Sequence, residues 1–528
     1  MSNSKSQLVL AIDLGTSGPK VAIAGLAGKI IDAEIGSTPI LLLPDGGAEQ
    51  DPRSWWAAIK EATRTLLTRH PDLIDGIAAV CCTTQWSGTV PVDRTGTSLA
   101  NAIIWMDARG ARYLPKIVGG SVQVAGYRPD KLWKWLRLTG GAPSHSGKDS
   151  IAHILYLKEE QPDLYNAAYK FLEPKDYLNL CLTGRFAASY ESITLHWVTD
   201  NRDINNIIYS DQLLKMAGID RQKLPDLKQS TATLGPILPE VAHELGLPPQ
   251  TQVIMGTPDM HSAAIGSGSI QDYEAHLYIG TSSWLSCHVP FKKTDIAHNM
   301  ASLPSAIPGR YFIVNEQETA GASLRYLKEN ILYHQDVLQR ETIPEDIYQV
   351  FDHIAAQVPA GSNGVIFTPW LNGERTPVDD HKARGGFFNL SLHHTRPDLI
   401  RAVFEGVAFN SRWLLHHVEK FIKRPFPAIN IVGGGAKSDI WCQIHADVLN
   451  KPIRQVKDPL QANTRGAAIL AGVALGATTF AEAANKTEIK QEFTPNPANR
   501  ELYDSLFDSF LAIYKRNKKI HARLSERF

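Results

Sequence analysis

Short apolar runs alternate along the chain with longer stretches of helical periodicity. The runs Leu8–Ile12, Ile77–Cys82 and Val253–Met255 are each bounded by polar or glycine-rich residues, as is typical of buried strands. Residues Pro52–His70 carry apolar side chains at helical spacing, and Asp51 stands in front of them as an N-cap. This alternation of strands and helices predicts an α/β fold.

A strand–turn–strand pattern occurs at the head of each half. Leu8–Ile12 runs into Asp13-Leu14-Gly15-Thr16-Ser17, and Ala275–Ile279 runs into Gly280-Thr281-Ser282-Ser283. The recurrence predicts a duplicated fold, in which residues 1–268 and 269–528 form two similar domains that face one cleft. Residues from about 113 to 226 are expected to form a mostly helical insertion that walls a pocket.

The stretch from Thr251 to Ser283 combines two chemical features. Gly256 is expected to end the strand Val253–Met255, Asp259 follows, and a small-residue helix is expected from Met260 to Ala264. A Gly/Thr/Ser turn after a buried strand can cradle phosphate oxygens with backbone N–H groups. A carboxylate nearby can act as a general base, although Asp259 could equally serve as the N-cap of its helix.

Further polar and aromatic groups follow other predicted strands. Gln85 and Trp86 come after Ile77–Cys82, and Trp105, Asp107 and Arg109 come after a second apolar run. Ligands bind at strand ends in open α/β sheets, so these residues are candidates for a binding pocket. Gly433-Gly434-Gly435, between a strand and a helix, could admit a base or a phosphate against bare backbone.

Composition limits the kinds of partner that the protein is expected to bind. The chain has 528 residues, which favours two large domains, and its 54 basic and 54 acidic residues cancel. That balance gives no electrostatic reason to expect nucleic acid or an anionic membrane as partner. Five scattered cysteines show no metal-ligand spacing, which fits a reducing cytoplasm. The first residues do not resemble a signal peptide, and no apolar run is long enough to span a bilayer.

Four motifs in the same order resemble those of the FGGY family of carbohydrate kinases, within the sugar kinase, chaperone ATPase and actin superfamily. They are I-D-L-G-T-S-G-P-K, G-T-P-D-M-H-S-A-A-I-G, Y-I-G-T-S-S and I-V-G-G-G-A-K-S-D-I-W. The runs L-N-G-E-R-T-P and R-G-G-F-F-N-L-S-L are similar to the xylulokinase branch. The resemblance covers nearly the whole chain and implies two actin-like, ribonuclease H-like ATPase domains flanking a nucleotide cleft.

The resemblance also implies roles for individual residues. Asp259 is expected to be the catalytic base, and Asp13 is expected to orient Mg²⁺. The sugar site is expected to comprise Gln85, Trp86, Trp105, Asp107, Arg109 and Met260. The ATP site is expected to comprise Asp13, Gly15, Thr16, Ser17, Lys20, Gly280, Thr281, Ser282, Gly434, Gly435, Ala436 and Ser438. Lys20 could equally be a solvated strand lysine.

The implied reaction is transfer of the γ-phosphoryl group of ATP to a sugar hydroxyl, and the expected acceptor is a ketopentose such as xylulose. Xylulokinases usually carry Gln-Met-His where this chain has Gln85-Trp86-Ser87, so another ketose or polyol is the first alternative. A non-catalytic ATP-dependent switch on the same fold is the second. A homodimer is an open option for the assembly.

Overall fold

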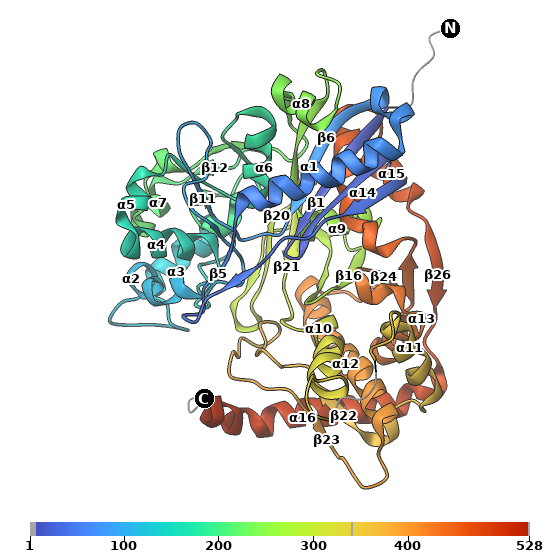
Figure 1. Ribbon diagram of the computed structural model, residues 1–528. Coiled ribbons are helices and arrows are strands. Elements are labelled where there is room, and N and C mark those ends of the chain that lie inside the picture. Colours follow the sequence, from blue (N-terminus) through green and yellow to red (C-terminus); the bar gives the residue numbers. More distant parts are fainter. Residues whose placement is uncertain (1–6, 339–341, 526–528) are drawn as a thin grey trace.

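The computed structural model describes residues 7–338 and 342–525; residues 1–6, in the stretch compared above with a signal peptide, lie outside them. Its centre is formed by two mixed sheets, one in each half of the chain (Figure 1). The strands of the first sheet, in spatial order, are β14 (Thr233–Pro236), β15 (Gln252–Pro258), β6 (Ile77–Thr84), β1 (Leu8–Gly15), β2 (Gly18–Gly25) and β3 (Ile30–Ile35).

The second sheet repeats the plan of the first. Its strands, in spatial order, are β17 (Ser283–Ser286), β16 (Ala275–Ile279), β24 (Ile429–Val432), β25 (Ile453–Val456) and β26 (Ile489–Phe493). In each sheet an antiparallel hairpin, β1–β2 or β16–β17, is followed by two parallel neighbours and an antiparallel edge strand. The duplicated α/β fold predicted from the repeated turn is therefore confirmed.

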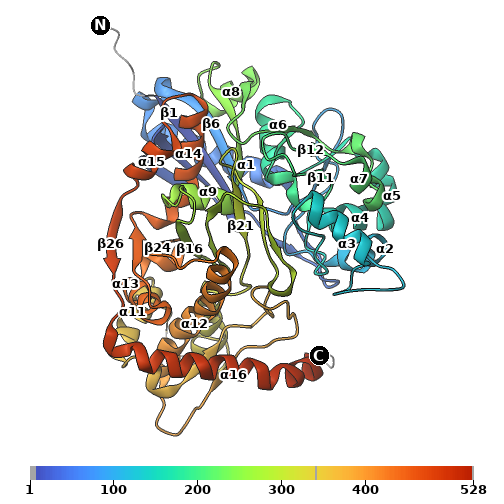
Figure 2. The ribbon, with the colours of Figure 1, turned by 180° about the vertical axis from the view of Figure 1, so that it is seen from behind.

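β1 is buried on both faces, and each face of the first sheet packs against a helix. Leu10 and Ile12 pack in one apolar cluster with Trp55 of α1 (Pro52–Arg69). Val9 and Ala11 belong to a second cluster with residues of α14 (Ala462–Ala474). Alternate side chains of a strand point to opposite faces, so α1 and α14 cover opposite sides, as the two opposed views show (Figures 1 and 2).

Glycines let α14 approach α9 (Asp259–Gly266) backbone to backbone. A Cβ added to Gly266 would lie 1.8 Å from the carbonyl oxygen of Ala462. A Cβ added to Gly466 would lie 2.0 Å from the carbonyl oxygen of Ser262. Only glycine fits at either position, and this crossing joins a helix of the second half to the helix that begins at Asp259.

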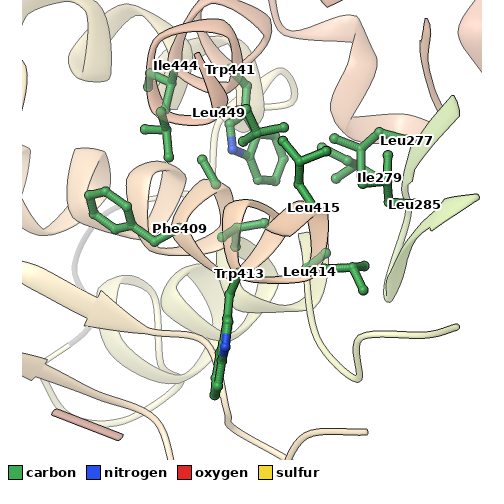
Figure 3. Close-up of a cluster of buried hydrophobic side chains, with 14 of the residues drawn as sticks. Leu277, Ile279, Leu285, Phe409, Trp413, Leu414, Leu415, Trp441, Ile444 and Leu449 are labelled. Atoms are coloured by element: carbon green, nitrogen blue, oxygen red, sulfur yellow. The ribbon is translucent and has the colours of Figure 1, made fainter. Parts of the chain in front are cut away.

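The core of the second half surrounds α12 (Arg396–Ile422). Leu414 and Leu415 turn toward Leu277 and Ile279 of β16, while Trp413 points away from the strands (Figure 3). The indole ring of Trp413 instead packs against aromatic side chains of α16 (Arg500–Ser525). A further layer of the same core comes from α13 (Asp439–Leu449).

One strand end differs from the prediction. β15 does not stop at Gly256 but runs on to Pro258, with a shift in its register to β6 between Ile254 and Thr257. Gly256 has a φ of +69°, and an added Cβ would lie 2.0 Å from the carbonyl oxygen of Cys82. The glycine forms a bulge that carries the strand to Asp259, because only glycine allows that approach.

The segment from 113 to 226 combines six α-helices with several short strands, and several of its residues wall the cavity described below. The helices of this segment are α2 (Leu114–Val118), α3 (Pro129–Leu138), α4 (Ser150–Glu160), α5 (Pro162–Ala167), α6 (Pro174–Thr183) and α7 (Asp211–Ala217).

Among the described residues, no helix is both long and apolar enough to cross a membrane.

Candidate active site

A cavity of about 820 Å³ lies between the two halves, and both Gly-Thr-Ser turns contribute to its wall. The first turn contributes Gly15, Thr16 and Ser17, and the second contributes Thr281 and Ser282. Two glycine- and hydroxyl-rich turns that face one cavity can hold the oxygens of a polyphosphate through backbone N–H and hydroxyl groups.

Side chains fix the first turn from behind. The Thr16 hydroxyl accepts a hydrogen bond from Nε1 of Trp105 at 2.9 Å and donates one to Oε1 of Gln85 at 3.2 Å. Nε2 of Gln85 donates to Oε1 of Gln50 at 2.8 Å, and Nε2 of Gln50 donates to the carbonyl of Thr16 at 2.9 Å. Gln85 and Trp105 line the cavity, but their polar atoms hold the turn.

Asp13 stands at the end of β1, where residues of the other half reach it. Nδ2 of Asn463 donates a hydrogen bond to Oδ1 of Asp13 at 3.2 Å, and Nζ of Lys20 lies 3.7 Å from Oδ2. Lys20 also donates to the carbonyl of Leu460 and is mostly buried, so it is not a solvated strand lysine. Burial raises the pKa of Asp13, although Lys20 and Asn463 oppose that rise.

Asp259 is the first residue of α9 and lines the same cavity. Its Oδ1 accepts a hydrogen bond of 2.7 Å from the backbone N–H of Met260, so it also satisfies one free donor of the helix. Burial, and then the charge of Asp13, raise the pKa of Asp259 to about 8. A carboxylate with a pKa near neutrality is suited to accept a proton from a hydroxyl.

Aromatic side chains form the wall around Met260. Trp284, which follows the second turn, stacks on Tyr278 with ring centroids 4.0 Å apart. Trp86 lies edge-on to the ring of His261 at 5.4 Å, and its indole donates to the carbonyl of Ser192 at 3.0 Å. Trp86, Met260 and Trp284 present apolar surface to the cavity, which suits the C–H face of a polyol.

Asp107 and Arg109, predicted for the sugar site, do not line the cavity. Asp107 is buried and accepts hydrogen bonds from the N–H of Ala48 at 3.0 Å and from Nε of Arg109 at 2.9 Å. Arg109 also pairs with Glu49 at 2.6 Å and donates to the hydroxyl of Tyr156 at 3.0 Å. Both side chains therefore fasten the loop after β8 (Ala102–Ile103) from within the protein.

The glycine-rich motif after β24 lies outside the cavity wall, beside it. A Cβ on Gly434 would have Leu460, a wall residue, as its nearest neighbour at 4.0 Å. A Cβ on Gly435 would lie 2.4 Å from the side chain of Ile279, so this glycine is required for packing. Ala436 is buried, and the Ser438 hydroxyl caps α13 by accepting from the N–H of Trp441 at 3.1 Å.

The cavity also contains charged residues to which the sequence assigned no role. Lys148 and Asp149 come from the helical segment of the first half, and Glu316 and Arg375 come from the second half. Nζ of Lys148 pairs with Glu318 across the two halves at 2.8 Å. The one signal in the sequence was the run L-N-G-E-R-T-P, which contains Arg375 but gives no indication of its partners.

The family models that match the chain agree with this architecture. The FGGY family of carbohydrate kinases, N-terminal domain, matches residues 8–266, and the C-terminal domain of that family matches residues 275–475. A xylulose kinase from Staphylococcus epidermidis is 31% identical over 98% of both chains. A gluconokinase from Bacillus subtilis is 24% identical over 89% of this chain and 88% of that protein.

Solved structures show the same fold. A gluconate kinase and a ligand-bound xylulose kinase, both from Lactobacillus acidophilus, are each 26% identical to this chain with a TM-score of 0.83. Each comparison covers 98% of this chain, together with 99% of the gluconate kinase and 100% of the xylulose kinase.

Proposed function

Because the chain belongs to the FGGY family of carbohydrate kinases, we propose that it transfers the γ-phosphoryl group of ATP to a hydroxyl of a ketopentose such as xylulose. The observation that carries this proposal is the single cavity that contains both Gly-Thr-Ser turns and the carboxyl group of Asp259. Phosphoryl transfer requires mainly positioning and charge stabilisation, and these groups can provide both.

In this proposal the two turns hold the phosphates of ATP. Backbone N–H groups of Thr16, Ser17, Thr281 and Ser282 bind the phosphate oxygens, with Gly15 and Gly280 at the strand ends. The hydroxyl groups of Ser17, Thr281 and Ser282 add to them, whereas the Thr16 hydroxyl already donates to Gln85. The open space beside Gly434 takes the adenosine. The hydrogen bonds that hold Thr16 from behind mean that little of this loop needs to reorganise when nucleotide binds.

Asp259 acts as the general base in the proposed mechanism. It accepts the proton of the sugar hydroxyl as that oxygen attacks the γ-phosphorus, a role that contributes about 10²–10⁴ in rate. Its hydrogen bond to Met260 orients the carboxylate without occupying its second oxygen. The helix N-terminus and the proton acceptor therefore belong to the same residue.

The residues near Asp13 fit a magnesium ion that accompanies the nucleotide. Asp13 and Asp259 repel each other, since the charge of Asp13 adds to burial in raising the pKa of Asp259. Oδ1 of Asn463, beside Asp13, is buried and accepts no hydrogen bond from the described residues. Carboxylate and amide oxygens suit Mg²⁺, and Asp13 would hold it, mainly through water. Bound there, the ion would neutralise phosphate charge.

Xylulose is favoured over other acceptors by the relatives of the chain and not by the fold. Xylulose kinases from Lactococcus lactis and Bacillus subtilis are 29% and 27% identical over 98% of this chain. A gluconate kinase of the same fold has the same TM-score as a xylulose kinase, so another acceptor is the alternative. A cytoplasmic location is proposed from the five free cysteines, and a homodimer stays a prediction.

A coupled assay for ADP release, run with a panel of ketoses, alditols, glycerol and gluconate, tests the function. We expect turnover with ketopentoses and the strongest signal with xylulose. Mass spectrometry of the product identifies a sugar monophosphate and distinguishes transfer to sugar from hydrolysis of ATP. ATP hydrolysis that no sugar accelerates would contradict the proposal.

A further inference from the structure

Five charged side chains form one group at the cavity, here called the charged wall: Lys148, Asp149, Glu316 and Arg375, which line the cavity, and the buried Glu318 that pairs with two of them. Nζ of Lys148 lies 2.8 Å from Oε1 of Glu318. Nε of Arg375 lies 2.6 Å from Oε2 of Glu318, and Nη1 of Arg375 lies 2.5 Å from Oε2 of Glu316. Both cations are thus already paired with carboxylates of the protein.

The charged wall carries an excess of negative charge. Two cations face three carboxylates, and Asp149 is the carboxylate that forms no ion pair among the described residues. The pairing is firm, because burial would raise the pKa of Glu318 but Arg375 and Lys148 hold it at about 2. Nη2 of Arg375 is buried and has no hydrogen-bond partner among the described residues, so a ligand meets one cationic donor within a group whose net charge is negative.

Asp149 has one carboxylate oxygen committed and one available. Its Oδ2 accepts hydrogen bonds from the N–H of Ser144 at 2.8 Å and from Nε1 of Trp197 at 2.7 Å. Its Oδ1 accepts none from any residue that the structure describes, although Asp149 is only 9% exposed and lines the cavity. A nearly buried acceptor that faces the cavity without a protein donor is placed to accept a hydrogen bond from a ligand.

The wall adjoins the reacting end of the cavity. Glu316 lies close enough to Asp259 to add to the effects that raise its pKa, after burial and Asp13. Arg375, which pairs with Glu316, in turn opposes the rise in the pKa of Asp149 that burial causes. A path of neighbouring charges therefore leads from Asp259 through Glu316 and Arg375 to Asp149.

We propose that Asp149 is a specificity-determining residue that accepts a hydrogen bond from a hydroxyl of the acceptor sugar. We further infer that the charged wall limits the acceptor to uncharged ketoses and alditols and excludes aldonates such as gluconate. A carboxylate on the ligand would be desolvated beside three fixed carboxylates, whereas a hydroxyl supplies the donor that Asp149 lacks. The inference rests on the proposed carbohydrate kinase function and narrows its substrate class.

Asp149→Asn is the sharpest test because it changes the chemistry of a single atom. The amide oxygen can keep both hydrogen bonds, from Ser144 and Trp197, and no helix cap is lost, because the Asp149 side chain makes no cap hydrogen bond to α4. The amide nitrogen then replaces the free acceptor with a donor. Asp149→Ser is the second variant, since it removes the carboxylate together with its charge.

Kinetics with xylulose, ribulose, xylitol and gluconate, and calorimetric titration with each compound without ATP, provide the readouts. Wild-type protein is expected to bind and phosphorylate the best neutral compound and to discriminate against gluconate. In Asp149→Asn, kcat/KM and affinity for that compound should fall about 10- to 100-fold, the value of a hydrogen bond to a charged group. The kcat/KM and the affinity for gluconate should not fall, so the preference for the neutral compound over gluconate becomes smaller.

Asp51→Asn is the matched control, since Asp51 is the N-cap of α1 and lies away from the cavity. It should leave selectivity unchanged, and thermal unfolding should show that all variants fold. Selectivity in Asp149→Asn and Asp149→Ser within twofold of wild type would overturn the inference. So would a wild type that prefers gluconate, although the kinase function would then stand. Failure to phosphorylate any sugar would overturn the proposed function itself and this inference with it.

Discussion

Replacement of Asp259 by asparagine should stop the reaction and at the same time make the protein more stable. Asparagine keeps the size of the side chain, and its amide oxygen can still accept the hydrogen bond from the N–H of Met260. It cannot accept a proton from the sugar at neutral pH. We therefore expect kcat to fall by about 10²–10⁴, with the KM for sugar largely kept.

The gain in stability follows from the pKa of about 8 that burial, Asp13 and Glu316 give Asp259. In the unfolded chain the pKa is about 3.9, so between these two values only the folded state keeps the proton. The unfolded state binds fewer protons in this window, and wild-type stability therefore falls as pH rises from about 4 to about 8. At pH 7 the resulting loss in the free energy of unfolding of the wild type reaches about 4 kcal/mol as an upper limit, at about 1.36 kcal/mol per pH unit.

Thermal unfolding of both proteins between pH 5.5 and 8.5, without nucleotide, measures this effect. The melting temperature of Asp259→Asn should exceed that of wild type, and the difference should grow with pH up to about 8. Coupled ADP assays on the same samples give kcat and the KM for sugar. A variant that keeps the wild-type rate would show that Asp259 only caps α9. Equal pH dependence in the two proteins would refute the reasoning about its buried charge.

Three further predictions address the remaining parts of the site. For wild type, kcat/KM for sugar should rise about tenfold per pH unit and level off above about pH 8, because Asp259 must lose its proton before it can act as a base. The measurement is made with ATP and sugar both below saturation. A flat profile from pH 6 to 9 would argue against Asp259 as the base. Gly434→Val has room for its Cβ and should raise the KM for ATP while that for sugar changes little; unchanged ATP affinity would remove the motif from the nucleotide site. Trp86→Ala opens the wall beside His261 and should change the ranking among sugars more than ATP turnover without sugar; an unaltered ranking in the substrate panel would exclude Trp86 from the sugar site.

The sequence predicts best what is determined locally. The strands β1 and β16, their Gly-Thr-Ser turns and the helix behind Asp51 follow from short apolar runs and capping residues, and the structure has them in place. The duplicated topology could be inferred because the same turn recurs at the same place in each half. Gly256 misled the prediction because a glycine can carry a strand through a bulge as well as end it.

The direction in which a side chain points was harder to predict. Asp107 and Arg109 follow a strand like many ligand-binding residues, but their hydrogen bonds to Ala48, Glu49 and Tyr156 turn them into the protein. Lys148 and Glu318 are 170 positions apart, and no local pattern reveals that they meet. Asp149 lies within the segment predicted to be mostly helical, directly before α4, where an aspartate ordinarily suggests only a cap.

The path of the chain between the two sheets has a consequence for folding during translation. After β25 the chain leaves the second sheet, lays α14 on the first, and returns as β26. Until α14 has emerged from the ribosome, Val9, Ala11 and the neighbouring residues of the first sheet lack the part of their cover that α14 provides. One apolar face of the half that is synthesised first therefore stays partly exposed until almost the whole chain has been made. During translation that nascent sheet is the surface on which chaperones would be expected to act.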